Sequence, residues 1–452
     1  MDVLNSIALP QSREHFHLLL LVYNIVMVFL LPYLALLVGS LVAAVLMDGR
    51  AGKTGDADMG HLARRLAGIA LPDRSTFIFL VVLPSTVVVF LFVQMFQGTT
   101  AMAAGFAALG ALLLIAGGIA AFVFKFTFTL DDMIALAGEG AGKKDGAAPP
   151  EAVTGFLTAT RTSHSRSGKW AAMLLLAGAF LFVGASTIGL NPEHWQAVDG
   201  FFALLLTGEV WIDVLAFFAA AAGMSGAGLL FSRFVWHQGG VTRDREDAMI
   251  RRTAVRLTTG GVLAMPLLFL LGTALIPETS LTGWAFVLLA FSFAAFGLAL
   301  HFLYAFVKSG KSVYSALLLI MVVAGLGLSV TKTQIALHTA TADHAARLAA
   351  VFEKHTEELR SSLGVMARQM TGEDIYNAKC SACHLFDQKK VGPPYKEVLV
   401  KYAGNKPALI AFVLNPVKVN PAYPNMPSQG LKASEADSIA TYLMGKVLGK
   451  SE

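Results

Sequence analysis

Eight long apolar stretches constrain this chain more than any other feature of its sequence. They cover approximately residues 16–47, 75–97, 101–124, 170–190, 210–232, 257–276, 281–307 and 312–331. Each is long enough to span a membrane, because a helix needs roughly 20 apolar residues to cross about 30 Å of hydrocarbon. The chain is also 55% hydrophobic and only 14% charged, whereas soluble domains carry about 25% charged residues. These values exclude a single soluble domain and predict a mainly α, eight-span transmembrane helix bundle.

The first stretch is longer than one membrane crossing requires and contains Pro32 near its middle. We therefore expect it to tilt, kink or project beyond the bilayer. It lacks the charged n-region and short apolar core of a cleavable signal peptide. It is expected to stay in the membrane as the first span.

The positions of Lys and Arg predict the orientation of the bundle. Basic residues occur in the loops 48–74, 125–169, 233–256 and 308–311, whereas the alternate connections 98–100, 191–209 and 277–280 contain no Lys or Arg. Short cytoplasmic loops are enriched in Lys and Arg. We therefore expect the basic loops in the cytoplasm and both ends of the bundle on the outer side. This interpretation explains the arginine runs better than nucleic-acid binding does.

The composition changes after the bundle, which we assign to residues 1–332. Residues 333–371 are polar but keep one apolar helix face, formed by Leu348, Phe352, Leu359, Leu363, Met366 and Met370. This pattern predicts a long amphipathic linker helix. A separate domain of about 80 residues follows over 372–452, and domains of that size usually need a cofactor or metal to complete the core.

Cys380-Ser381-Ala382-Cys383-His384 is the motif that carries chemistry in this domain. Two thiols at this spacing can each bond a haem vinyl group, and the adjoining histidine can then bind the iron. The alternatives are a thioredoxin-type redox pair and half of a zinc site. No βαβ pattern surrounds the motif, and the chain has only two cysteines.

Met426 is the candidate for the second axial ligand. It lies in the proline-rich segment Tyr423-Pro424-Asn425-Met426-Pro427, 42 residues beyond His384. A thioether ligand favours ferrous iron and raises the reduction potential. The alternative is that Met426 only fills the core. Ser434–Leu443 follows as an expected helix that begins with a capping serine.

Together these residues resemble a class I cytochrome c domain. The resemblance includes Tyr376 before the haem motif, Val391-Gly392-Pro393-Pro394 after it, Asn415-Pro416, the methionine loop and Tyr442 in a final helix. It implies one covalent haem c and a role for the Pro393 carbonyl in orienting His384. It also implies haem attachment outside a bacterial inner membrane, the side that the basic loops predict independently.

The membrane region shows only a weak resemblance. Its opening segment, Glu14-His15-Phe16-His17-Leu18-Leu19-Leu20, is similar to the first helix of the large subunit of cytochrome bd-type quinol oxidases, where an outer-side histidine binds haem. The later spans lack the quinol-loop and arginine signatures of that family.

Several polar residues lie at the predicted outer boundary and could form a second haem or quinol site. The candidates are His17, His194, His338, Glu209 and Asp213, and His15, His344 and His355 lie on the same side. Paired histidines can bind haem b, and the two carboxylates, four residues apart on one helix face, could accept protons from a quinol. The alternative for all of them is solvation at the membrane interface.

Three functions remain open from the sequence. The first is an electron-transfer subunit of a respiratory quinol-linked oxidoreductase complex, with membrane partner subunits, an outer-side electron donor or acceptor and a link to the quinone pool. The second is a structural membrane scaffold that tethers a cytochrome c domain near another enzyme. The third is a membrane oxidase with substrate chemistry in the helical domain, because the arrangement resembles membrane-bound urate-oxidising enzymes that end in a cytochrome c domain.

Overall fold

The computed structural model describes residues 11–145, 151–236, 244–362 and 370–449. Helices joined by turns make up these ranges, and no strand occurs in them. The chain divides into two compact units, Met1–Glu353 and Lys354–Glu452. Each unit has its own hydrophobic core, so each is described separately.

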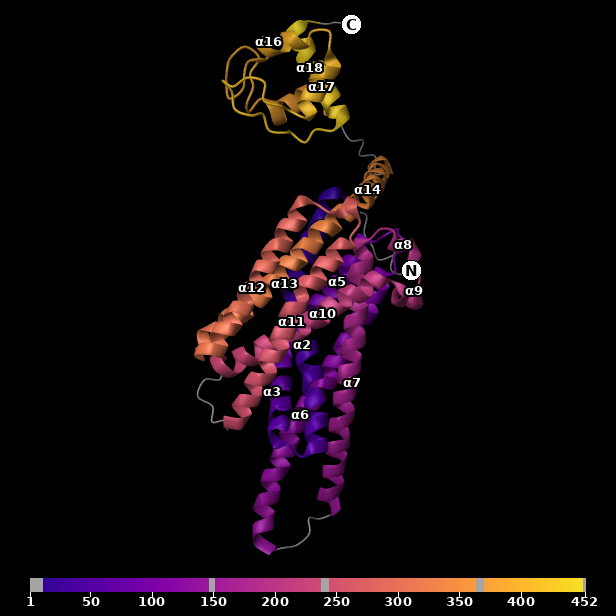
Figure 1. The fold of residues 1–452 in the computed structure, drawn as a ribbon. Helices are drawn as coiled ribbons and strands as arrows, with labels where there is room; N and C mark the ends of the chain where they lie inside the picture. The colour runs from indigo at the N-terminus through magenta and orange to yellow at the C-terminus, as the bar shows by residue number, and fades with distance from the viewer. Residues whose placement is uncertain (1–10, 146–150, 237–243, 363–369, 450–452) are drawn as a thin grey trace. The chain divides into compact units, whose positions relative to one another are not determined.

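Eight helical segments within the described ranges are long and apolar enough to cross a membrane, which confirms the predicted spans. They are α2 (Arg13–Thr54), α4, η1 and α5 together (Arg74–Met95), α6 (Ala103–Asp145), α7 (Glu151–Leu190), α10 with η2 (Gly208–Trp236), α11 (Asp244–Ala274), α12 (Gly283–Ser309) and α13 (Ser312–Ala340). The chain is thus a multi-pass membrane protein built as a helix bundle (Figure 1).

Helix α2 shows why these sequences form membrane helices. The Ser12 hydroxyl begins the helix by accepting a hydrogen bond from the His15 amide at 3.2 Å. One face of α2 is buried in the bundle, while the large apolar side chains on the other face are exposed, which suits contact with lipid. The exposed side chains follow helical spacing at Leu18, Leu21, Ile25 and Phe29.

Helix α2 also continues through Pro32 to Thr54 without ending. Its 42 residues correspond to about 63 Å at 1.5 Å per residue, twice the thickness of the hydrocarbon core. We expected the first span to tilt, to kink or to project beyond the bilayer. The length of α2 agrees with the last of these, because the helix is too long to be contained in the bilayer.

The predicted basic loops are largely helical rather than irregular. Helix α3 (Ala57–Ala70) occupies most of 48–74, because Leu62, Leu66 and Ala70 form a buried helix face. Helices α6 and α7 extend past the hydrophobic region side by side (Figure 1).

Several of the arginines in these segments form ion pairs. Arg65 Nε lies 2.8 Å from Glu246 Oε1, and Arg233 Nε lies 2.8 Å from Asp247 Oδ1. Arg245 Nε lies 3.2 Å from the buried carboxylate of Asp58. The Arg65 and Arg245 pairs connect the segments 48–74 and 233–256, and the Arg233 pair lies within the second segment.

The segment predicted as one linker helix over 333–371 is divided. Residues 333–340 complete α13, and α14 (Ala342–Ser362) begins after a turn at Thr341. The Leu337 carbonyl accepts from both the Thr341 hydroxyl at 2.8 Å and the Thr341 amide at 2.9 Å, which closes the C-terminal end of α13. Residues 363–369, which include Leu363 and Met366, lie outside the described residues.

The C-terminal unit is a small helical domain. Thr371 and Asp374 form a capping box that begins α15 (Gly372–Ile375), which leads into η4 (Tyr376–Cys380). The unit also contains α16 (Tyr395–Val398), η5 (Leu399–Tyr402), α17 (Lys406–Leu414) and α18 (Ala433–Leu448).

Two close contacts define how this domain is assembled. A side chain at Gly372 would approach Tyr442 Cβ to 2.3 Å, so glycine lets α15 pass directly over α18. The prediction that Ser434 caps the final helix was wrong, because α18 begins at Ala433. Its first turn is closed by Glu435, whose carboxylate accepts from the Lys432 amide at 2.9 Å.

Candidate functional site

The Cys380–His384 motif forms a tight turn at the end of η4. The amides of Cys383 and His384 both donate to the Cys380 carbonyl, at 3.1 and 2.9 Å. The Gly392 amide donates to the Cys383 carbonyl at 2.8 Å, which joins the following loop to the motif. The turn therefore holds both thiols and the imidazole in fixed positions. Burial raises the pKa of the Cys380 thiol above its ordinary value.

The His384 imidazole is held on three sides. Its Nδ1 lies 2.9 Å from the Pro393 carbonyl oxygen, a contact that fixes which ring nitrogen is available for metal. The Tyr395 ring stacks on the imidazole with centroids 5.0 Å apart. A side chain at Gly392 would come within 2.2 Å of imidazole Cε1, so only glycine fits there. Nε2 is left as the nitrogen that can bind a metal.

Met426 lines the same cavity as Cys380 and His384, a space of about 530 Å³. A second, smaller cavity of about 80 Å³ is lined by both cysteines together with His384 and Met426. Lys379 Nζ donates to the Gln429 carbonyl at 3.2 Å, which ties the methionine loop to the motif. Two thiols, an oriented imidazole and a thioether around one mainly apolar cavity fit a covalently bound haem.

Comparison with known proteins agrees with this geometry. Residues 367–443 match the family model described as cytochrome C oxidase, cbb3-type, subunit III. A cytochrome c-551 of Pseudomonas denitrificans is 33% identical over 79 residues, which cover 95% of that protein and 16% of this chain. The chain belongs to the cytochrome c family.

A second cytochrome c-551, from Azotobacter vinelandii, is 57% identical over 35 residues. That match spans 43% of the relative and 8% of this chain. No solved structure matches the chain. The family match covers residues 367–443 and none of the eight spans, so the similarity of the membrane region to the bd-type oxidases and to the urate-oxidising enzymes stays a prediction.

Membership of the cytochrome c family implies a covalent haem c and an electron-transfer function. Cys380 and Cys383 are the residues that would attach the haem, with His384 and Met426 on the iron and Pro393 orienting the imidazole. The haem supplies one-electron oxidation and reduction. The protein contributes the ligands, their orientation and the apolar surroundings that set the potential.

The structure brings some of the predicted outer-side residues together. His338 Nε2 lies 3.1 Å from His17 Nδ1, and the two exposed rings stack with centroids 5.0 Å apart. His194 Nε2 lies 3.8 Å from Glu209 Oε2. Glu209, His194 and Asp213 line one small cavity of about 30 Å³. The five candidates thus form two groups rather than one site.

His344 joins neither group. Its ring is buried and lies edge-on to Trp195, with centroids 5.4 Å apart. Burial is the main cause that lowers its pKa below the ordinary value, and the nearby Arg347 adds to the shift.

Lys332 is the residue that the sequence analysis missed. It lies one position beyond the predicted eighth span, but in the structure it belongs to α13 and is buried. Lys332 and Asp213 line a common cavity of about 130 Å³ inside the bundle. A lysine at the end of an apolar stretch is the signal that could have identified it, because charged side chains within membrane helices usually mark functional sites.

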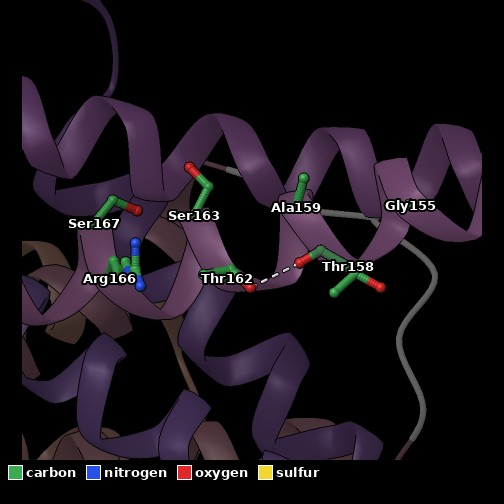
Figure 2. Close-up of a pocket in the computed structure, with 7 residues that line it drawn as sticks. All are labelled: Gly155, Thr158, Ala159, Thr162, Ser163, Arg166 and Ser167. Carbon is green, nitrogen blue, oxygen red and sulfur yellow. Dashed lines mark hydrogen bonds between the residues drawn. The ribbon is translucent and has the colours of Figure 1, made fainter.

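A further depression lies along the exposed side of α7, and Figure 2 shows the side chains around it. The Thr162 hydroxyl donates to the Thr158 carbonyl at 2.8 Å within the helix. The lining residues are Gly155, Thr158, Ala159, Thr162, Ser163, Arg166 and Ser167. None of these seven is a histidine, cysteine or acid, so this surface offers neither haem ligands nor proton acceptors.

Proposed function

We propose that this chain is a membrane-anchored c-type cytochrome that serves as the electron-transfer subunit of a respiratory quinol-linked oxidoreductase complex. The main support is the covalent continuity of a haem-binding domain with eight apolar helices. Quinones dissolve in the bilayer, and a protein that exchanges electrons with them needs a membrane region. The half-buried Asp213 and the buried Lys332 further support chemistry within that region.

The redox balance indicates partner subunits. Oxidation of one quinol to quinone releases two protons and two electrons, and each electron reduces one ferric haem to ferrous haem. The single haem-attachment motif provides for one electron at a time. We therefore propose further membrane subunits and an outer-side electron donor or acceptor that restores the haem between transfers.

We place the chain in a bacterial inner membrane with the haem domain on the outer side. The alternation of basic and non-basic connections supports this orientation. Gly200 and Gly52 provide a test, because an added side chain at either position meets nothing within 4 Å. In intact cells an impermeant thiol reagent should label Gly200→Cys and leave Gly52→Cys unlabelled. Equal labelling would contradict the orientation.

A haem b in the bundle would bind at the His17–His338 pair, which joins α2 to α13. As they stand, the two nitrogens are 3.1 Å apart, whereas ligands on opposite sides of one metal ion lie about 4 Å apart, given metal–nitrogen bonds of about 2 Å. Binding would therefore require the rings to separate. Acid–acetone extraction of the purified full chain measures noncovalent haem, and His17→Ala should abolish it. Absence of extractable haem in the wild type excludes this centre.

Reduction of haem c by quinol is the experiment that tests the proposed function. The purified full chain is mixed with a short-chain ubiquinol under anaerobic conditions, and the ferrous haem absorbance is followed in time. Rapid reduction supports the proposal, and ascorbate serves as a control for a competent haem. Reduction by ascorbate but by no quinol favours the scaffold alternative. Reduction by urate instead favours the membrane oxidase.

A further inference from the structure

We propose that the cavity shared by Asp213 and Lys332 binds the ring of a quinol or quinone, an inference that rests on the proposed function and locates its substrate. The cavity is enclosed by residues of α2, α7, α10, α11 and α13. It lies entirely within the membrane unit, between helices that are separated widely in the sequence. The family match, over residues 367–443, does not include these residues.

The size and lining of the cavity suit one aromatic ring. Its volume is about 130 Å³, and a cavity of about 150 Å³ in another protein accommodates benzene. Most of the wall is apolar and includes Met27, Leu30, Leu34, Phe217 and Phe269. A ring within these walls would be surrounded mainly by apolar side chains.

The cavity lining includes an acid and an amine, between which the described part of the chain shows no direct ion pair. Lys332 is only 5% exposed, and its Nζ donates to the Thr273 hydroxyl at 2.8 Å. The Asp213 carboxylate accepts from the Thr187 hydroxyl at 2.8 Å. Because isolated charges are costly inside a bilayer, a purely structural acid–amine pair is expected to close into contact. Here each group holds a different threonine and faces the same cavity.

Further polar groups line this cavity, among them Gln334 and Tyr23. Gln334 is buried, and its Oε1 has no hydrogen-bond partner among the described atoms. The Tyr23 hydroxyl lies 3.2 Å from the Ser186 hydroxyl. A buried amide oxygen without a partner is unfavourable, and a ligand hydroxyl would satisfy it.

The combination of groups selects the chemical class of the ligand. Asp213 would repel an anion, and Lys332 would repel a cation. A neutral ring that donates through a hydroxyl and accepts through a carbonyl suits both side chains. Quinol and quinone are the two states of such a ring. The quinol hydroxyl can donate to Asp213, and the quinone carbonyl can accept from Lys332.

Asp213 also provides a way out for the proton. Its carboxylate lines the second cavity of about 30 Å³, where Glu209 and His194 lie. Glu209 is one helical turn before Asp213 on α10, and His194 Nε2 lies 3.8 Å from Glu209 Oε2. A proton taken from the ring hydroxyl by Asp213 would pass through Glu209 to the partly exposed His194. The predicted carboxylates thus act as a relay on one side of the ring site.

Quinone binding to the purified full-length protein tests the site without depending on haem reduction. The probes are decylubiquinone, titrated to obtain Kd, and a photoreactive azido-ubiquinone whose attachment is mapped by mass spectrometry. The azido probe should label α2, α10 or α13 peptides that line the cavity. Lys332→Met should weaken binding by about tenfold or more, as expected for loss of a charged hydrogen-bond donor. The matched control, Lys308→Met at an exposed position of α12, should bind normally.

A second variant guards against misfolding of Lys332→Met. Ala216 is buried in the cavity wall, and Ala216→Leu fills the space while leaving every charged group in place. It should reduce decylubiquinone binding with an unchanged ascorbate-reduced haem spectrum. Unchanged Kd in both variants, labelling outside the cavity, or no quinone binding by the wild type overturns the site. If the azido probe labels the cavity but no quinol reduces the haem, the quinone site is supported and the proposed electron transfer is contradicted.

Discussion

The haem cavity and the intramembrane cavity are assembled in opposite ways. In the C-terminal domain, both cysteines and His384 come from one five-residue turn, and a single loop adds Met426. In the bundle, Asp213 and Lys332 come from α10 and α13, and three other helices complete the wall. A covalent cofactor can be held by a short local motif in a small domain, whereas buried charges require many helices around them.

The largest expected effect is the complete loss of covalent haem from the C-terminal domain, with no change in the membrane unit. Replacing both thiols, in Cys380→Ser/Cys383→Ser, should remove all covalently bound haem, because no other cysteine exists in the chain. Haem staining of a denaturing gel measures the loss. The membrane unit has a separate core, so its thermal unfolding in detergent should not change. A simultaneous loss of the bundle would show that the two cores depend on each other.

The next effect concerns the iron ligand in the methionine loop. Met426→Ala should lower the reduction potential by on the order of 0.1 V, since axial ligands set haem potentials over about 0.8 V. The near-infrared sulfur-to-iron charge-transfer band should disappear. Met444, buried in α18, provides the control, and Met444→Leu should keep both properties. Persistence of the band in Met426→Ala would exclude Met426 as the ligand.

A smaller effect should follow from crowding His384. In Gly392→Ala the new methyl group would meet the imidazole at 2.2 Å, and overpacking of this kind costs about 1–3 kcal/mol. Chemical denaturation followed by haem absorbance gives the change in stability. Gly445 lies in α18 with nothing within 4 Å of an added Cβ, and Gly445→Ala should instead stabilise by roughly 1 kcal/mol. Equal effects of the two changes would contradict the role of Gly392.

The smallest expected effect is a change in how the thermal stability of the membrane unit depends on pH. The folded-state pKa of His344 is lowered, mainly by burial, so the unfolded chain binds a proton more readily. Stability from this group is complete above the unfolded pKa of about 6.5 and declines as the pH falls below it. In His344→Phe the thermal midpoint should fall less between pH 7 and pH 5 than in the wild type. A steeper fall in the variant would contradict this assignment.

The membrane unit and the haem domain also differ in how much of their structure could be predicted from the sequence. A helix in hydrocarbon must be apolar on nearly every face, so composition alone located all eight spans. The haem motif was identifiable because its thiols and imidazole are adjacent in sequence. Met426 stood out only through the prolines around it, and its place beside His384 in one cavity depends on the fold.

The missed features depend on tertiary contacts. Lys332 was excluded from the eighth span because its charge ended the apolar stretch, although its ammonium group reaches the Thr273 hydroxyl inside the bundle. Nothing local in the sequence pairs His17 with His338, which lie 321 positions apart. Helix α3 was predicted as part of a loop because its charged residues, Asp58, Arg64 and Arg65, interrupt the apolar pattern of the buried face.

The length of α2 has a mechanical consequence. This one helix contributes His17 to the pair with His338 and Tyr23 to the cavity shared by Asp213 and Lys332. It also contributes Asp48, whose carboxylate lies 3.0 Å from His164 Nε2. Backbone hydrogen bonds fix the rise per residue, so the helix cannot shorten or stretch. A rigid-body displacement of the His17 end of α2 would therefore be absorbed by bending at Pro32 or be transmitted toward Asp48. Helix α2 in this way forms a rigid connection between the His17–His338 pair and the Asp48–His164 pair.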